Sequence, residues 1–188
     1  ILPAFKSYAN RKNIALSLNS GYKTLEVCID EDKIQHVLFN ILSNAFKFTP
    51  GGGSVQIDVL TEDDNKNVLI KVTDTGTGIA PDKLQLIFER FAQFEITSGT
   101  RGSGVGLSLC KEYIELHHGK LCAENNQNGG TKFIIRLPMG NSHFMEDEIL
   151  SSEPNEEKKS VETQIFEYED ITQIKRRADY IKNKENPV

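Results

Sequence analysis

The sequence predicts an α+β fold, a two-layer α/β sandwich in which helices cover one face of a mixed sheet. Short segments that alternate apolar and polar residues predict strands, and longer segments with apolar residues three or four positions apart predict helices. These segments come in the order strand, strand, helix, strand, strand, helix, loop, helix, strand, strand. That order lacks the regular strand–helix alternation of a dinucleotide-binding fold, and the sandwich is therefore favoured.

The first part of the chain predicts two strands and a long helix. Residues 14–18 and 24–29 alternate apolar and polar side chains, and Gly21 between them indicates a hairpin or a loose turn. Asp30 is a suitable N-cap for the helix that follows, and Pro50 ends that helix. Its apolar residues lie at helical spacing: Ile34, Val37, Leu38, Ile41, Leu42 and Ala45.

The middle of the chain predicts a hairpin, a short helix and a loop. Strands over 54–61 and 68–73 are joined by the polar segment 62–67. Pro81 is a favoured residue in a first helical turn, so a short helix is expected to begin there. Residues 92–103 are rich in Gly, Ser and Thr and have no clear period, which predicts a mobile loop.

A second long helix and two strands complete the predicted domain. Apolar residues recur at helical spacing from Val105 to Leu116, and Gly119 is expected to end that helix. Strands over 120–124 and 131–137 follow, with a turn at the glycine pair 129–130.

Charge and composition divide the chain at about residue 139. Residues 1–139 hold 15 acidic and 15 basic side chains, whereas residues 140–188 hold 12 and 7. We expect residues 1–139 to form one domain and residues 140–188 to be an acidic linker, either with a short helix over 168–182 or as an unstructured spacer. A neutral body with an acidic tail argues against a nucleic-acid partner. No apolar run reaches the roughly 20 residues that span a bilayer, so no membrane contact by this fragment is expected.

Two asparagines and a lysine share one face of the first long helix. Asn40 and Asn44 are one turn apart, and Lys47 follows three residues later. An amide oxygen suits Mg²⁺ when phosphates supply further ligands, so Asn44 is the candidate metal ligand. Lys47 would neutralise a phosphate as a point charge. The alternative is an ordinary solvated helix face.

A second cluster, Asp74-Thr75-Gly76-Thr77-Gly78, directly follows a predicted strand. Glycines allow the backbone to approach a flat ligand closely. The carboxylate of Asp74 could accept a hydrogen bond from an adenine amino group, whereas a guanine carbonyl would face it with a second acceptor. The alternative is an Asx-type turn that binds nothing.

Two further segments are weaker signals. Gly102, Gly104 and Gly106 precede a helix, where backbone N–H groups attract phosphate, but no acidic residue on a second strand supports a dinucleotide fingerprint. In the segment 88–91, the phenylalanines are expected to pack, and Arg90 is expected to reach a phosphate or to pair with Glu89.

In their order along the chain, the four segments resemble the N, G1, F and G2 boxes of the ATP-binding domain of sensor histidine kinases, in the gyrase–chaperone–histidine kinase–mismatch-repair ATPase superfamily. Residues 36–50 are similar to the N-box region, and 130–138 to the closing strand. The resemblance implies a Bergerat fold that binds ATP and Mg²⁺, with residues 92–103 as the ATP lid.

The resemblance also assigns roles to individual residues. Asn40, Asn44 and Lys47 are implied as the catalytic residues, with Asn44 on the metal. Asp74 is implied to bind the adenine amine, and Thr131 to reach the adenine site through water. The implied nucleotide-binding residues are Asn44, Lys47, Phe48, Asp74, Gly76, Gly78, Ile79, Arg90, Phe91, Gly102, Ser103, Gly104, Val105, Gly106, Leu107 and Thr131.

Asn40 separates a kinase from a hydrolase within the superfamily that the chain resembles. The ATP-hydrolysing relatives carry Glu at this position, and an amide cannot act as a general base. We therefore expect ATP to persist until a stronger nucleophile arrives, and the resemblance implies that this nucleophile is a protein histidine. None of the four histidines has the sequence context of a phosphoacceptor: His36, His117, His118 and His143.

The resemblance implies the partners of the fragment. The phosphoacceptor histidine is expected on a dimerisation hairpin of the parent protein, which the start of the chain at Ile1 would follow. The parent is expected to be a homodimeric hybrid kinase that signals to a receiver domain or response regulator. Three widely spaced cysteines, without metal-ligand spacing, indicate a cytoplasmic domain, with the parent anchored in the bacterial inner membrane. A conformational ATPase or a non-catalytic nucleotide-binding module are the alternatives.

Overall fold

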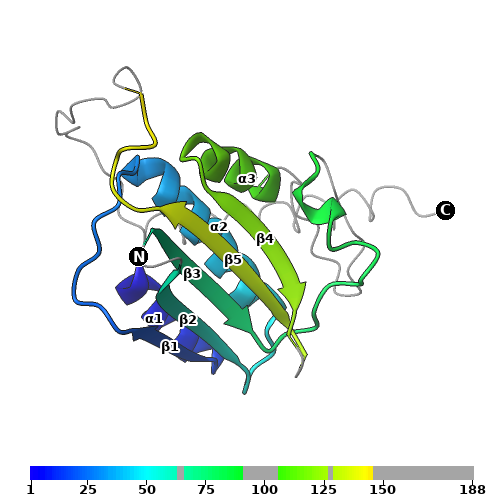
Figure 1. The fold of residues 1–188 in the computed structure, drawn as a ribbon. Helices are drawn as coiled ribbons and strands as arrows, with labels where there is room; N and C mark the ends of the chain where they lie inside the picture. The colour runs from blue at the N-terminus through cyan, green and yellow to red at the C-terminus, as the bar shows by residue number, and fades with distance from the viewer. Residues whose placement is uncertain (63–65, 91–105, 127–128, 146–188) are drawn as a thin grey trace, which may run out of the picture. The chain divides into compact units, whose positions relative to one another are not determined.

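The computed structural model describes residues 1–62, 66–90, 106–126 and 129–145, and these residues contain a five-stranded sheet with the order β1-β2-β3-β5-β4 (Figure 1). Only β1 and β2 pair in parallel, and the other neighbours are antiparallel, so the sheet is mixed as predicted. The strands are β1 (Ala15–Ser20), β2 (Ser54–Glu62), β3 (Asn67–Asp74), β4 (Lys120–Asn125) and β5 (Thr131–Pro138).

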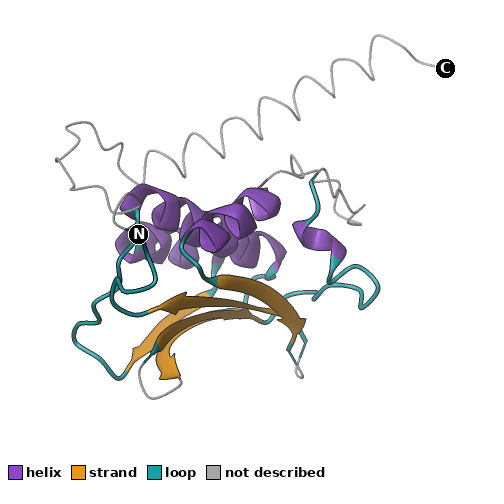
Figure 2. Cartoon of the chain, turned by 45° about the horizontal axis from the view of Figure 1, so that its top comes forward, coloured by secondary structure: helices purple, strands orange, loops and turns teal. Residues whose placement is uncertain are grey.

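The helices lie together on one face of the sheet, which confirms the predicted two-layer sandwich (Figure 2). They are α1 (Leu2–Lys12), α2 (Glu31–Phe48) and α3 (Gly106–Leu116), and a 3₁₀ turn, η1 (Leu86–Phe88), follows β3. No helix in the described part of the chain is both long and apolar enough to cross a membrane.

The core lies between α2 and the inner face of the sheet. The predicted apolar stripe of α2 is buried except for Leu38, which is partly exposed, and Phe46 is buried as well. Alternate residues of β2, β3 and β5 face it, because successive side chains of a strand point to opposite faces. The buried residues of these strands include Val55, Ile57, Val68, Val72, Phe133, Ile135 and Leu137.

Residues 24–29 do not form the predicted strand. In this segment only Val27 makes a β-bridge, to Gly140, and β1 pairs in parallel with β2 instead of forming a hairpin. The segment leads across to the start of α2, where the Asp30 N–H binds His117 at the end of α3. Residues 24–29 therefore run away from β1. Despite their alternating pattern, they have no described strand beside them with which to form a ladder.

Two other helical features differ from the prediction. Residues 2–12 form α1, for which no helix was expected. Phe5 of α1 stacks on Phe46 with ring centroids 5.6 Å apart, and this contact with α2 is invisible in local sequence. The short helix predicted from Pro81 is a series of turns that leads into η1.

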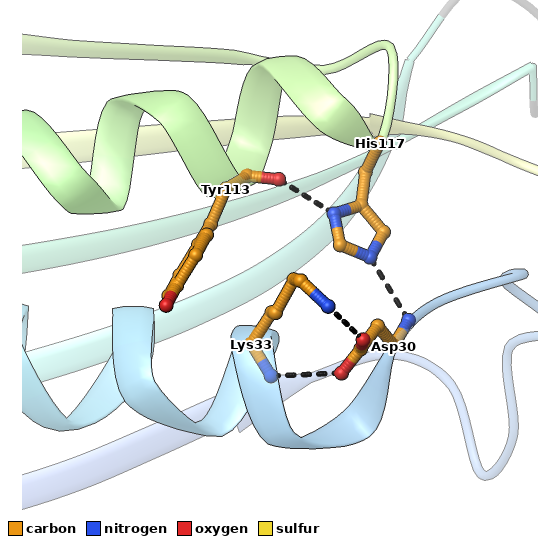
Figure 3. Close-up of polar contacts among 4 residues, drawn as sticks. All are labelled: Asp30, Lys33, Tyr113 and His117. Carbon is orange, nitrogen blue, oxygen red and sulfur yellow. Dashed lines mark hydrogen bonds and ion pairs between the residues drawn. The ribbon is translucent and has the colours of Figure 1, made fainter.

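A hydrogen-bonded link joins the end of α3 to the start of α2 (Figure 3). The Asp30 backbone N–H can only donate, so the His117 Nε2 that it contacts at 2.9 Å accepts. Nδ1 then carries the proton and donates to the Tyr113 carbonyl at 2.6 Å. Asp30 also caps α2 by accepting from the Lys33 N–H at 3.0 Å, and its carboxylate pairs with the Lys33 ammonium.

Candidate functional site

The polar face of α2 meets the first residue of α3. Asn40, Asn44 and Lys47 are each partly exposed and lie along one border of the buried stripe of α2. The Asn40 amide donates to the His36 carbonyl at 3.1 Å. A methyl group on Gly106 would lie 2.7 Å from Asn40 Oδ1, so a side chain at residue 106 would displace this amide. Two of the segments singled out in the sequence are therefore adjacent.

Asp74 ends β3 and is the only buried acidic residue in the described part of the chain, with 3% of its surface exposed. Its Oδ1 accepts from the Gly76 N–H at 2.8 Å and from the Thr131 N–H at 3.2 Å. Burial raises the pKa of the Asp74 carboxyl, and these two N–H groups act in the opposite direction. Among the described residues, no hydrogen bond reaches Oδ2.

The contact with Gly76 is the Asx-type turn that the sequence offered as the alternative to a ligand site. The two interpretations are compatible, because the turn uses Oδ1 and leaves Oδ2. A methyl group on Gly76 would lie 2.5 Å from the Phe48 carbonyl oxygen and 2.8 Å from Asp74 Oδ1. The end of α2 thus packs directly against the loop after β3.

The second part of this loop contacts the end of β4 and the residue just before β5. Gly78 has a φ of +71°, and a methyl group there would lie 3.2 Å from Asn125 Oδ1. Ile79 donates its N–H to Asn125 Oδ1 at 2.9 Å, and its carbonyl accepts from Asn125 Nδ2 at 2.7 Å. Gly130, with a φ of +88°, has no room for a side chain because the Asp74 carbonyl lies against it.

Asn125 was missed in the sequence analysis. In a sequence, an asparagine at the end of a predicted strand indicates only a turn. Its contact spans 46 positions of the chain, so no local signal marks it.

Arg90 pairs with Glu112 of α3 and not with Glu89. Its Nη2 and Nε atoms lie 2.6 and 3.1 Å from the same carboxylate oxygen. Both side chains are exposed, so the pair contributes little to stability. Phe88 packs edge-on against Phe133, with centroids 6.5 Å apart, as expected for a packing residue.

The remaining predicted site residues fall into two groups. Lys47 lies over the Phe48 ring, with Nζ 5.1 Å from its centroid, and Leu107 is partly exposed in the first turn of α3. The others lie outside the described residues, and their contacts stay predictions: Phe91, Gly102, Ser103, Gly104 and Val105.

The described site residues thus gather from five elements. The end of β3 and the loop after it lie between the C-terminal end of α2 on one side and the β4 and β5 ends on the other. Asn40 and Gly106 bring the start of α3 to the polar face of α2. The arrangement offers one buried carboxylate, amide side chains, a lysine and backbone without side chains.

The family model described as "Histidine kinase-, DNA gyrase B-, and HSP90-like ATPase" matches residues 29–141. Histidine kinase P4 of Formosa agariphila is 34% identical over 79% of this chain and 11% of its own length. Hybrid signal transduction histidine kinase D of Dictyostelium discoideum is 39% identical over 74% of this chain and 9% of its own length. The chain therefore spans about a tenth of the length of these two relatives.

Solved structures give the same result. Full-length ShkA in complex with AMPPNP is 27% identical, with a TM-score of 0.64, over 73% of this chain and 28% of that one. Histidine kinase ThkA in complex with response regulator protein TrrA is 29% identical, with a TM-score of 0.60, over 74% of this chain and 38% of that one. The chain belongs to the histidine kinase-, DNA gyrase B- and HSP90-like ATPase family, as a catalytic and ATP-binding domain of the sensor histidine kinase type.

Proposed function

We propose that the chain binds Mg-ATP and donates the γ-phosphoryl group to a histidine on a separate dimerisation hairpin of the parent protein. The observation that carries this proposal is the buried Asp74 beside a loop whose Gly76 and Gly78 leave backbone uncovered. A buried carboxylate is costly unless a partner stabilises it. The related ShkA structure contains AMPPNP.

In this proposal, Asp74 recognises the adenine base. Its Oδ1 is held by the Gly76 and Thr131 N–H groups, and Oδ2 accepts from the adenine amino group. Guanine would present a carbonyl at this place, and two acceptors repel. Phe48, which packs against this loop, and Ile79, within it, would contact the base, and the buried Thr131 would reach it through water.

The phosphates would lie over the polar face of α2. Asn44 supplies an amide oxygen to Mg²⁺, and Lys47 neutralises a phosphate. The described residues contain no cluster of three or more His, Cys, Asp or Glu side chains. A Mg²⁺ at Asn44 would therefore take its other ligands from phosphate and water. The bound ion would neutralise charge that develops on the transferred phosphoryl group.

Asn40 favours a kinase over a hydrolase. Its amide holds the His36 carbonyl and abuts Gly106, and it has no basic lone pair with which to activate water. ATP would then persist until a histidine approaches. Arg90, the backbone of Gly106 and Leu107, and the undescribed residues 91 and 102–105 complete the proposed nucleotide site.

The phosphoacceptor is proposed to be none of this chain's own histidines, because none has the sequence context of a phosphoacceptor. His117 is also buried, and both of its ring nitrogens are engaged in hydrogen bonds. We place the acceptor on the parent's hairpin, in a homodimer.

We also place a receiver domain or response regulator downstream of the hairpin. The ThkA–TrrA complex and the hybrid relative support this assignment. The domain itself would work in the cytoplasm, with the parent anchored in the membrane.

Two measurements test the proposal. Titration calorimetry should show Mg-ATP binding by the wild-type chain and its loss in Asn44→Ala, with Asn19→Ala, on the far edge strand, as the control. The chain should also transfer label from γ-labelled ATP to the parent's hairpin, added in trans, as acid-labile phosphate. ATP binding without any label on the hairpin would favour a non-catalytic nucleotide-binding module, and label released only as free phosphate would favour a hydrolase.

A further inference from the structure

We infer that Asn125, at the end of the edge strand β4, is a positioning residue that fixes the adenine side of the nucleotide site. Its amide holds both backbone polar groups of Ile79, the N–H at 2.9 Å and the carbonyl at 2.7 Å. A carboxamide is the side chain that matches a peptide unit in this way, because it carries one acceptor and one donor group. This inference rests on the proposed function of the same site.

The contact fixes a loop that is otherwise held at only one end. The first part of the loop is anchored by Asp74 Oδ1, which binds the Gly76 N–H. Asn125 anchors the second part at Ile79, beyond Gly78, whose φ of +71° is unfavourable for other residues. In Figure 1 the loop runs from the end of β3 past the ends of β5 and β4 toward η1. Apart from the two bonds to Asn125, the backbone of residues 77–79 makes no hydrogen bond to the sheet among the described residues.

The same strand end is tied to the base-reading carboxylate. Asn125 pairs with Thr131 in the β4–β5 ladder, and the Thr131 N–H binds Asp74 Oδ1 at 3.2 Å. One strand pair therefore sets the position of Asp74 through Thr131 and the position of Ile79 through Asn125. Both sides of the proposed adenine site are thus bonded to the β4–β5 strand pair, whereas the proposed phosphate side depends on α2 and α3.

Loss of the Asn125 amide should weaken ATP binding without changing chemistry at the phosphates. The Ile79 N–H would exchange faster with solvent in the nucleotide-free protein. Each ATP molecule would have to order the loop, which costs free energy on binding. Ground state and transition state contain the same adenine, so the loss is uniform and raises KM while kcat is retained. We expect Asn125→Ala to raise the KM for ATP about tenfold.

The experiment measures hydrogen exchange at Ile79 in the nucleotide-free chain and the kinetics of phosphoryl transfer to the parent's hairpin. Asn125→Asp separates the two hydrogen bonds, because the carboxylate still accepts from the Ile79 N–H but faces the Ile79 carbonyl with a second acceptor. Its KM should rise as well. Asn19→Ala is the matched control, since Asn19 also makes an exposed side-chain hydrogen bond, to Asp58, on β1 at the opposite edge of the sheet.

Faster Ile79 exchange together with a raised KM and an unchanged kcat would support the inference. An unchanged KM with faster exchange would overturn it, because the contact would then be structural only. A lowered kcat at constant KM would overturn it too, since that result indicates a smaller folded fraction. Absence of phosphoryl transfer by the wild-type chain would instead contradict the proposed function. Hydrogen exchange is measured without nucleotide, so it tests the Asn125 contact whether or not phosphoryl transfer occurs.

Discussion

The buried carboxylate of Asp74 destabilises the fold but has a proposed role in nucleotide binding. Burial disfavours its carboxylate and raises the pKa of the group, while the N–H groups of Gly76 and Thr131 offset part of that effect. A residue selected for stability alone would be neutral here. Groups with such perturbed pKa values concentrate at functional sites, which agrees with the proposed adenine contact.

Replacing Asp74 by asparagine should separate stability from binding. In Asp74→Asn, Oδ1 can still accept from both N–H groups, and no charge is buried, so the nucleotide-free protein should be at least as stable as wild type at neutral pH. Affinity for ATP should fall at least tenfold, because a hydrogen bond to a charged group contributes about 1.5–3 kcal/mol. Denaturant unfolding and calorimetry measure the two quantities, with Asp58→Asn on β2 as the control. A clearly less stable Asp74→Asn protein would mean that the charge itself holds the loop.

The raised pKa of Asp74 also sets a pH dependence. Because the folded protein holds this proton more tightly than the unfolded chain, Asp74 makes stability fall as pH rises from the ordinary value of 3.8 through the raised value. ATP affinity should change in the opposite direction, since only the carboxylate accepts from the adenine amine. Nucleotide titrations over an acidic pH series should show weaker binding at lower pH, and Asp74→Asn should remove this part of the dependence. A pH profile identical in both proteins would exclude Asp74 as the titrating group.

Among the elements, α2 carries both the core and the proposed chemistry. One of its faces is buried against the sheet, and Asn40, Asn44 and Lys47 lie along one border of that face. As the crossover between the parallel strands β1 and β2, it is fixed at both ends. Asp30 caps its start and is linked to α3 through His117, and Phe48 at its end packs on Gly76.

The cap of α2 can be tested separately from its ion pair. Asp30→Ala removes the hydrogen bond to the Lys33 N–H and should cost about 1 kcal/mol of unfolding free energy. Asp30→Asn keeps an acceptor for that N–H and should cost less, because an exposed ion pair with Lys33 is worth little. The backbone link from residue 30 to His117 remains in both variants. Equal losses in the two variants, measured by denaturant unfolding, would show that the carboxylate charge matters more than the cap.

Elements with local signals were predictable, and elements defined by distant partners were not. The length and stripe of α2 follow from Asp30, the spacing of its apolar residues and Pro50. Residues 24–29 alternate as a strand does, but a strand needs a neighbouring edge, and the link from Asp30 to His117 takes the chain elsewhere. In the site, the Asp74–Gly76 turn is a local motif. The contacts of Asn125 with Ile79 and of Arg90 with Glu112 join residues 46 and 22 positions apart, and sequence alone gives no sign of them.

At the scale of the whole molecule, the folded unit is larger than the family match. The match covers residues 29–141, whereas the compact unit extends over Ile1–Ile149. Strand β1 and helix α1 lie before residue 29, and Phe5 of α1 is almost fully buried. Its ring stacks on Phe46 and lies 5.7 Å from Phe39, both in α2.

The aromatic contact between α1 and α2 should therefore be needed for a stable domain. Phe5→Ala should lower the free energy of unfolding by about 3–5 kcal/mol, the usual cost of emptying a buried phenylalanine site. Leu18→Ala, at a half-exposed position of β1, should change it by less than about 1 kcal/mol. Because Phe46 directly precedes Lys47 and Phe48 in α2, loosening it should also weaken ATP binding, and saturating Mg-ATP should recover part of the lost stability. A Phe5→Ala protein as stable as Leu18→Ala would show that α1 is only an appendage and that residues 29–141 carry the fold without it.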